Sequence, residues 1–148
     1  MCIQITRNKE VIPPTPKPKP TIRREIEKVE LCQLLQKRFP DAIIRVSDST
    51  TKLCSIEDIN AFLAVDETNR IKYQAEDMDC DDFAFVLLGQ FSTPPWSATA
   101  FGFIWTDTHA MNVCVDANLD IWLIEPQTDG LKSKLESWQG IKVLELFI

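Results

Sequence analysis

The chain lacks the features by which nucleic-acid and membrane proteins are usually recognised. Its 148 residues carry a formal net charge of -6, and its basic residues form only short groups, such as those at Lys17–Lys19 and Arg23–Arg24. A protein that follows a phosphate backbone needs a broad positive surface, so we expect no nucleic-acid partner. No apolar run approaches the roughly 20 residues that cross a bilayer, so we expect no membrane partner.

The chain also lacks a signal peptide and a cysteine framework. Residues Met1–Asn8 contain no long apolar run of the kind that directs secretion, which predicts a cytoplasmic protein. The cysteines are odd in number and show no Cys-x-x-Cys spacing, so we expect reduced thiols rather than disulfides. We expect Cys32, Cys54 and Cys114 to be buried and inert, because a free cysteine behaves as a small hydrophobic residue.

Composition indicates one folded domain preceded by an arm. Hydrophobic residues make up 45% of the chain, which is enough to build a core. Residues 1–20 are rich in proline and favour an extended polyproline II conformation. We expect this segment to be an arm outside the core, with recruitment of a proline-binding partner as an alternative. Residues 21–148 then form a single domain.

Helical patterns come first along the chain, and strand patterns follow. Apolar spacing predicts helices over residues 21–39 and 55–65, and from Asp79 or Cys80 to Gly89. Short apolar or alternating runs predict strands over residues 42–46, 97–105, 109–115, 119–124 and 142–147, with a tight turn at Asp116–Leu119. This order indicates an α+β fold in which N-terminal helices pack on an antiparallel β-sheet.

The most informative segment surrounds Cys80, where an acid-rich loop becomes an apolar helix. A helix N-terminus lowers the pKa of a thiol, because its free N–H groups and its dipole favour the thiolate. His109, the sole histidine, opens a predicted strand, and Glu125 closes the next one. These three residue types form a nucleophile, a base and an orienting group. We therefore expect a thiol enzyme with Cys80, His109 and Glu125 as catalytic residues.

The spacing of His109 and Glu125 predicts a direct contact between them. If the turn at Asp116–Asn118 joins the two strands, the hairpin is centred near residue 117 and the two side chains lie directly opposite. Cross-strand neighbours have Cβ atoms roughly 4.5–5.5 Å apart, which permits an imidazole–carboxylate hydrogen bond. A bulge in either strand would shift this register.

Three further residues have candidate roles in the same site. Gln74 precedes Cys80 in the loop, and its amide can donate to an oxyanion together with the Cys80 N–H. Trp96 and Trp105 are candidates for lining a substrate cleft. Plainer alternatives stay open for each residue, with Gln74 as an exposed loop residue and the tryptophans as core residues of the sheet.

Carboxylates crowd the sequence around Cys80 and would raise the pKa of its thiol. They are Glu76, Asp77, Asp79, Asp81 and Asp82. They are either solvated at the helix N-terminus or paired with Arg45 or Arg70. Alternatively, Asp79, Asp81 and Asp82 bind a hard cation such as Ca²⁺, which prefers oxygen ligands.

A zinc site made by Cys80, His109 and Cys114 is a weaker alternative. Positions 109 and 114 point to opposite faces of a regular strand, so one ion would not reach both side chains. We therefore expect calcium, if any metal, as the cofactor.

The segment Asp79–Ala84 resembles the Asp-Cys-Glu-Asp-Phe-Ala signature of bacterial transglutaminase-like cysteine peptidases. With His109 and then Glu125 following, and Gln74 at the offset of the papain-like oxyanion glutamine, the chain is similar to papain-like and transglutaminase-like cysteine hydrolases. The likeness over residues 70–130 is strongest to the calcium-dependent C-terminal protease domain of a fungal agglutinin. It implies a papain-like fold, a Cys-His-Glu triad and a calcium requirement.

These observations together predict a small cysteine hydrolase that cleaves a peptide, isopeptide or related amide bond in a peptide or protein substrate. Cys80 would attack the acyl carbon, His109 would act as base and then acid, and Glu125 would orient the imidazole. A transglutaminase-like acyl transferase and an inactive binding or inhibitory module on the same fold are the alternatives. The agglutinin's lectin module has no counterpart in the sequence, so the resemblance predicts no sugar partner.

Overall fold

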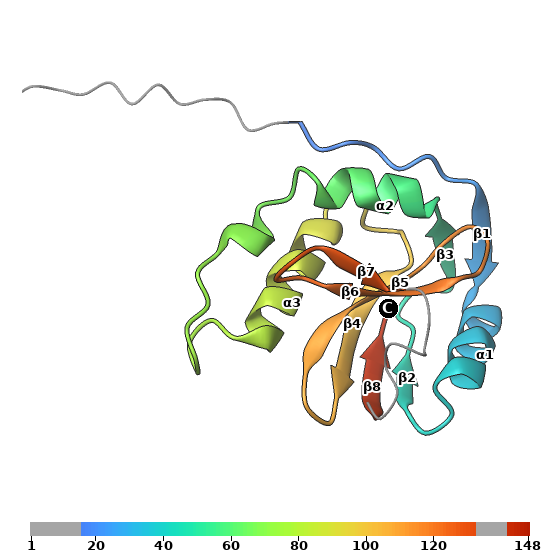
Figure 1. The fold of residues 1–148 in the computed structure, drawn as a ribbon. Helices are drawn as coiled ribbons and strands as arrows, with labels where there is room; N and C mark the ends of the chain where they lie inside the picture. Colours follow the sequence, from blue (N-terminus) through green and yellow to red (C-terminus); the bar gives the residue numbers. More distant parts are fainter. Residues whose placement is uncertain (1–15, 133–141) are drawn as a thin grey trace, which may run out of the picture.

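The structure is a computed structural model that describes residues 16–132 and 142–148. Helices and strands are interspersed up to Phe91, and among the described residues only strands follow (Figure 1). Their bounds are β1 Arg24–Glu27, α1 Lys28–Arg38, β2 Ile43–Arg45, β3 Thr50–Leu53, α2 Ile56–Leu63, η1 (a 3-10 helix) Thr68–Arg70, α3 Cys80–Phe91, β4 Phe101–Thr106, β5 Ala110–Val115, β6 Ile121–Glu125, β7 Gly130–Lys132 and β8 Val143–Phe147. Within the described ranges, no helix has the length and apolar character needed to cross a membrane.

The strands form a two-stranded sheet and a six-stranded sheet. β1 pairs with β3, and the larger sheet has the order β2-β8-β4-β5-β6-β7. Neighbours in the larger sheet are antiparallel except β2 and β8, which are parallel. A parallel pair needs a long crossover, and the chain between β2 and β8 provides one. The predicted α+β class is confirmed, whereas the expectation of a wholly antiparallel sheet is wrong.

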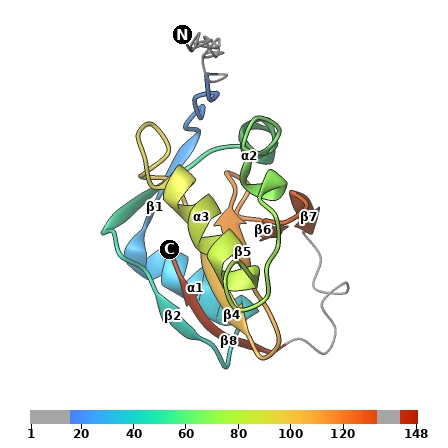
Figure 2. The ribbon, with the colours of Figure 1, turned by 90° about the vertical axis from the view of Figure 1, so that its left-hand side faces the viewer.

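Helices α1 and α3 cover opposite faces of the larger sheet (Figure 2). Side chains alternate along β4, because successive residues of a strand point to opposite faces. Ile104 packs in one core cluster with Leu35 of α1, while Phe101 stacks on Phe91 of α3 with ring centroids 3.6 Å apart. Two apolar layers therefore hold the sheet between the helices, and the α3 layer adjoins the candidate site.

Helices α2 and α3 begin where the sequence predicts. The Ser55 hydroxyl accepts the N–H of Asp58 at the start of α2. At α3, the Asp82 carboxylate accepts the N–H of Asp79 at 3.1 Å, just before the first helical residue, Cys80. Helix α3 continues beyond its predicted end at Gly89, because Phe91 is buried in the core and extends the helix by part of a turn.

The first predicted helix is partly wrong. Residues Arg24–Glu27 form strand β1, and α1 begins only at Lys28. β1 pairs with β3, which the sequence did not predict, and this pairing places Ile26 opposite Thr51 in the core. The apolar residues near this point fit a helical or a strand period over so short a stretch, so the partner strand decides the outcome. Edge strand β7 was also not predicted.

The predicted strand over residues 97–105 starts later than expected. Residues before Phe101 form turns in which Trp96 donates its N–H to Thr93 and accepts that of Thr99. The other predicted strands agree with β2, β5, β6 and β8 to within a residue or two at each end. The division between an arm and a domain at residue 20 stays a prediction, because residues 1–15 lie outside the described ranges.

Candidate functional site

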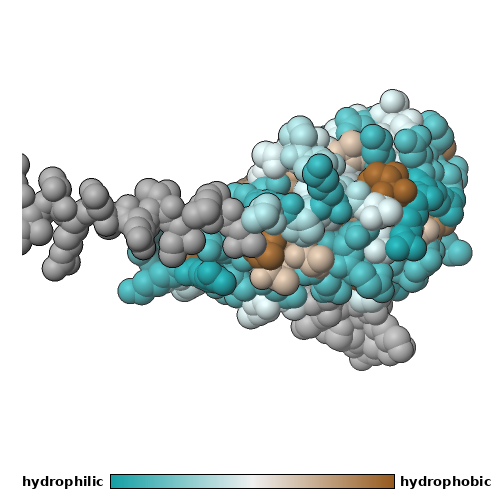
Figure 3. Space-filling model, turned by 90° about the horizontal axis from the view of Figure 1, so that it is seen from above, coloured by the Kyte–Doolittle hydropathy of each residue, from teal (hydrophilic) through white to brown (hydrophobic). Residues whose placement is uncertain are grey.

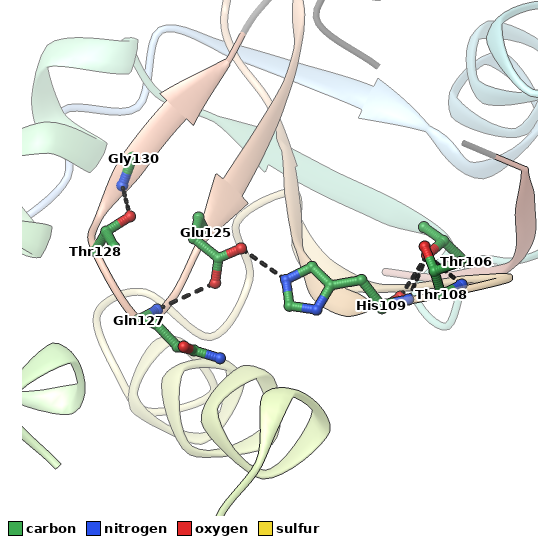
Figure 4. Close-up of polar contacts among 7 residues, drawn as sticks. All are labelled: Thr106, Thr108, His109, Glu125, Gln127, Thr128 and Gly130. Atoms are coloured by element: carbon green, nitrogen blue, oxygen red, sulfur yellow. Dashed lines mark hydrogen bonds and ion pairs between the residues drawn. The ribbon is translucent and has the colours of Figure 1, made fainter. Parts of the chain in front are cut away.

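His109 and Glu125 form a close polar pair at the adjacent ends of β5 and β6 (Figure 4). The Nε2 atom of His109 lies 2.6 Å from Oε2 of Glu125, and the two side chains are 29% and 24% exposed. The pair is therefore shielded in part from solvent, yet it remains within reach of a ligand. The contact predicted between these two residues is present in the structure.

The contact is diagonal rather than directly across the hairpin. Strands β5 and β6 pair with Asn112 opposite Ile124, which centres the hairpin one residue later than the sequence predicted. This difference moves every cross-strand partner by two positions, so each side chain keeps its face of the sheet. His109 and Glu125 are then diagonal neighbours, a separation that long side chains still span. The predicted register is wrong, but the predicted contact survives.

The hairpin loop explains the shifted centre. The carboxylate of Asp116 accepts the N–H groups of Asn118 and Asp120 at 2.8 and 3.0 Å, and its other oxygen accepts the indole N–H of Trp122. Leu119 has a φ of 68°, in the left-handed region that a tight loop requires. The buried Asp116 therefore organises a five-residue loop, Asp116–Asp120, where a shorter turn was expected.

The backbone of His109 is fixed by Thr106 on the neighbouring strand. The Thr106 hydroxyl accepts the N–H of His109 at 2.8 Å and donates to the carbonyl of His109 at 2.6 Å (Figure 4). The other oxygen of Glu125 accepts the N–H of Gln127. Both members of the pair are thus anchored by turn residues, which limits the number of conformations that the ring and the carboxylate adopt.

The pKa of His109 is raised above its ordinary value. The main cause is the hydrogen bond to the Glu125 carboxylate, which favours the protonated imidazole, and the charge of Glu125 acts in the same direction. Partial burial of the ring opposes this effect. The pair therefore favours a protonated imidazole beside the Glu125 side chain more strongly than an unpaired histidine would.

Cys80 lies at the N-terminus of α3, close in the fold to this pair. Its half-buried side chain packs against the cluster of Ala84, Phe103 and Ala110, and Ala110 directly follows His109. Within the described residues, however, the Cys80 thiol makes no hydrogen bond to the His109 ring. The fold brings the three predicted catalytic residues to one region without forming the thiol–imidazole hydrogen bond of a complete triad.

Of the other described cysteines, Cys54 and Cys114 are buried as the sequence predicts, whereas the prediction that Cys32 is buried is wrong. Burial raises the pKa of the Cys54 thiol to about 12, and burial also raises the pKa of Cys114. Cys32 is half-buried on α1. Thiolate chemistry is therefore disfavoured at Cys54 and Cys114, while Cys80 has the more accessible thiol at the candidate site.

The acid-rich loop brings Asp79, Cys80 and Asp81 together. Their possible ligand atoms lie within 4.8 Å of one another, and the pKa of Asp81 is raised mainly because its carboxyl group, when protonated, can donate a hydrogen bond to Asp79. Asp82 is engaged by the backbone at the start of α3. Asp79 and Asp81 could thus hold a hard cation, with Asp82 less free to join them, and calcium binding stays a prediction.

Two alternatives for the acids and the metal find no support in the described residues. Arg45 pairs with Glu145 at 2.6 Å, and Arg70 pairs with Glu67 at 3.0 Å, so neither arginine is engaged with the acid-rich loop. The group of possible metal ligands described above does not contain His109 or Cys114. A zinc site made from Cys80 and these two residues is therefore not formed.

Gln74 and the two tryptophans lie in three different environments. Gln74 is exposed and closes a tight loop by exchanging backbone hydrogen bonds with Met78, so its proposed oxyanion role stays a prediction. Trp96 is only 1% exposed and belongs to the core cluster of α2 and α3. Its side chain is covered in this structure, and its predicted substrate-binding role stays a prediction. Trp105 is 44% exposed at the end of β4 and remains available to a ligand.

Phe85 is a candidate residue that the sequence did not reveal. It lies on α3, is 44% exposed, and stacks on Phe103 with ring centroids 4.5 Å apart. Local pattern does not show whether Phe85 faces the core or the solvent, and only the packing of α3 on β4 shows that it is exposed. Phe85 and Trp105 together form an exposed aromatic surface, which we call the aromatic face.

Comparisons with known proteins place the chain by its fold. No protein-family model and no curated protein matches it. Among the solved structures, a PSL1a-E64 complex is 19% identical with a TM-score of 0.71, and covers 84% of this chain and 50% of its own. Polyporus squamosus lectin, bound to the human-type influenza-binding epitope Neu5Aca2-6Galb1-4GlcNAc, is 18% identical with a TM-score of 0.69, and covers 84% and 49%. The chain thus spans about half the length of these proteins.

These comparisons contradict the prediction of a cysteine hydrolase. The similar structures are those of a lectin, so the identification with papain-like and transglutaminase-like peptidases, the enzymatic activity and the papain-like description of the fold are all corrected. The expected peptide or protein substrate finds no support, since the ligand named with the lectin is a glycan. The residue types and their order match a catalytic triad. In the structure, however, the thiol of Cys80 makes no hydrogen bond to His109.

Proposed function

We propose that this chain is a ligand-binding domain whose ligand is a carbohydrate. Support comes from its likeness to Polyporus squamosus lectin, one structure of which holds the glycan Neu5Aca2-6Galb1-4GlcNAc. The likeness covers about half of that lectin, so the binding surface of this chain has to be argued from its own residues.

The aromatic face is the observation that carries the proposal. The rings of Phe85 and Trp105 have centroids 6.4 Å apart and an angle of 74° between their planes. Phe103 lies behind both, 4.5 Å from Phe85 and 5.2 Å from Trp105. Rings braced in this way offer apolar contact area at a low cost in conformational entropy, and the C–H groups of a pyranose ring can pack against them.

Polar groups for sugar hydroxyls lie on neighbouring positions of the same sheet. Trp105 of β4 is paired with Ala110 of β5, and Ala110 directly follows His109. The His109–Glu125 pair supplies a donor and an acceptor, both fixed by turn residues. Small-molecule sites combine apolar and aromatic surface with a few well-placed polar groups, and this region of the chain offers both.

Calorimetric titration of the chain with Neu5Aca2-6Galb1-4GlcNAc tests the proposal. We expect measurable binding that falls about ten-fold or more in Trp105→Ala and Phe85→Ala, since each substitution removes one exposed ring. Val29→Ala is the matched control, because Val29 is an exposed apolar residue on α1, across the sheet from α3. Absence of binding, or equal binding by the wild type and both aromatic variants, refutes the proposal.

A second candidate ligand is E64, because a similar solved structure is a complex with that compound. We propose that Cys80, together with His109, Glu125 and Gln74, forms the corresponding binding site in this chain. The supporting observation is the half-buried thiol at the start of α3, in a region that also holds the His109–Glu125 pair.

Native mass spectrometry with E64 separates this second candidate from the first. We expect one bound compound for the wild type and for Cys32→Ala, and none for Cys80→Ala. Cys32 is the control because it is a half-buried thiol on α1, away from α3. Binding that survives in Cys80→Ala contradicts the assignment of E64 to this site.

A further inference from the structure

Residues 16–20 are an extended segment that lies on the folded domain rather than apart from it. Figure 1 shows this segment passing α2 before the chain enters β1, and Figure 3 views the same region from above. Its sequence is Pro-Lys-Pro-Lys-Pro, and it contains neither helix nor strand. Such a segment keeps its carbonyl groups free for other partners, because it has no internal hydrogen bonds.

Lys17 makes three contacts with the domain through its ammonium group. It donates a hydrogen bond to the side-chain carbonyl of Gln90, lies 3.9 Å from a carboxylate oxygen of Asp66, and lies 4.7 Å from the ring centroid of Phe62. The Asp66 side chain is 3% exposed, whereas that of Lys17 is 35% exposed. A cation held by an aromatic face and a buried carboxylate is a specific arrangement.

Pro18 provides a second anchor point through its backbone. The indole N–H of Trp96 donates to the Pro18 carbonyl at 2.8 Å, and the ring of Trp96 packs edge-on against Phe62 and Phe91. Further along, the N–H of Thr21 donates to a carboxylate oxygen of Asp58. Aromatic grooves with an indole donor are a recurring means of binding proline-rich segments, because such segments are already extended before they bind.

We propose that Phe62, Asp66, Gln90 and Trp96 form a recognition groove for an extended Lys-Pro segment, and that residues 16–20 occupy it as an intramolecular ligand. The groove binds two groups of the segment, the Lys17 ammonium group and the Pro18 carbonyl. A lysine at the next alternate position, Lys19, is exposed, and its ammonium group makes no hydrogen bond, ion pair or cation–π contact with the described residues. The segment therefore docks in the register that places the first of its two lysines in the groove.

The groove accepts the same segment from another molecule when its own segment is displaced. A short tether gives the intramolecular ligand an effective concentration on the order of millimolar, so a free peptide competes poorly in the wild type. Lys17→Glu places a carboxylate beside the buried Asp66 and expels the tethered segment. Lys19→Glu makes the same change in charge two residues away and leaves the segment in place.

Two measurements on the full chain test this inference. In the first, hydrogen exchange of the Trp96 indole N–H is followed by NMR, with the signal assigned through Trp96→Phe. We expect exchange to accelerate about ten-fold in Lys17→Glu and to stay unchanged in Lys19→Glu, since loss of the Pro18 carbonyl leaves the indole without its acceptor. Equal exchange in the two variants overturns the proposal.

In the second, a fluorescein-labelled peptide with the sequence of residues 16–21 is titrated into each variant and followed by anisotropy. We expect binding to Lys17→Glu and little binding to the wild type or Lys19→Glu. Adding Asp66→Asn to Lys17→Glu should lower the affinity for the peptide about five-fold. This is the order of magnitude that a half-exposed ion pair beside a cation–π contact contributes. A peptide that fails to bind Lys17→Glu, or binds the two Asp66 forms equally, overturns the recognition groove.

Discussion

The His109–Glu125 pair predicts a specific dependence of stability on pH. Substituting Glu125→Gln keeps the shape of the side chain and a hydrogen-bond acceptor but removes the charge that raises the pKa of His109. A histidine whose pKa is raised by folding contributes stability that is fully present below its unfolded pKa. That contribution is lost as the pH rises through the folded pKa. The substitution should therefore cost most in mildly acidic solution and least in alkaline solution.

The magnitude follows from the geometry and exposure of the pair. A hydrogen bond to a charged group contributes about 1.5–3 kcal/mol when it is well shielded, whereas an exposed ion pair contributes less than about 1 kcal/mol. The side chains of His109 and Glu125 are 29% and 24% exposed, so the pair lies between these cases. We expect the free energy of unfolding to fall by about 1 kcal/mol near pH 5.5 and by much less near pH 9 in Glu125→Gln.

Two measurements check this reasoning, and the sole histidine makes the first unambiguous. NMR titration of the single imidazole should give a lower pKa in Glu125→Gln than in the wild type. Urea unfolding at both pH values then gives the difference in free energy, with Glu145→Gln as the control, since Glu145 pairs with Arg45 rather than with a histidine. An unchanged imidazole pKa, or a larger loss of stability in alkaline solution, refutes the argument.

Four further predictions concern the sheet, helix α3 and the acid-rich loop. Gly102→Ala should lower the free energy of unfolding by about 3 kcal/mol or more in urea titrations, because the new Cβ would lie 2.1 Å from the Phe147 carbonyl oxygen. Gly89→Ala has open space and should be neutral or stabilising. Asn112→Ala should cost about 2–3 kcal/mol, since the fully buried amide joins the Ala84 carbonyl of α3 to the Gly102 carbonyl of β4. If Asp79 and Asp81 bind calcium, millimolar Ca²⁺ should raise the melting temperature of the wild type but not of Asp81→Asn; equal shifts would exclude the site.

The residues of the candidate site could be selected from the sequence, but the contacts between their side chains could not be predicted from it. The order of Cys80, His109 and Glu125 and their positions at element ends follow from local patterns, and the structure brings all three to one region. Whether the thiol contacts the imidazole depends on how α3 packs against β5, which no local pattern specifies. The prediction of a hydrolase rested on the order of these residues along the chain, which does not specify their contacts in space. The comparisons contradict that prediction.

The two tryptophans show that the exposure of a side chain could not be predicted from the sequence either. Trp96 and Trp105 are equally apolar and lie in neighbouring parts of the sequence, so both were candidates for a cleft. Trp96 is buried beneath residues 16–20 and α2, while Trp105 is exposed at the end of β4. Exposure depends on segments that are distant in the sequence, and one of these is the proline-rich segment at residues 16–20.

The sequence by itself determined the features that depend on near neighbours. These are the α+β class, the capped starts of α2 and α3, and the hairpin that joins β5 to β6. Only the tertiary structure decided that residues Arg24–Glu27 are a strand, that His109 meets Glu125 along a diagonal, and that Lys17 lies over Phe62. Caps, periodicity and turns act within a few residues, whereas strand partners and burial depend on contacts between distant segments whose free energies appear only when the whole core forms.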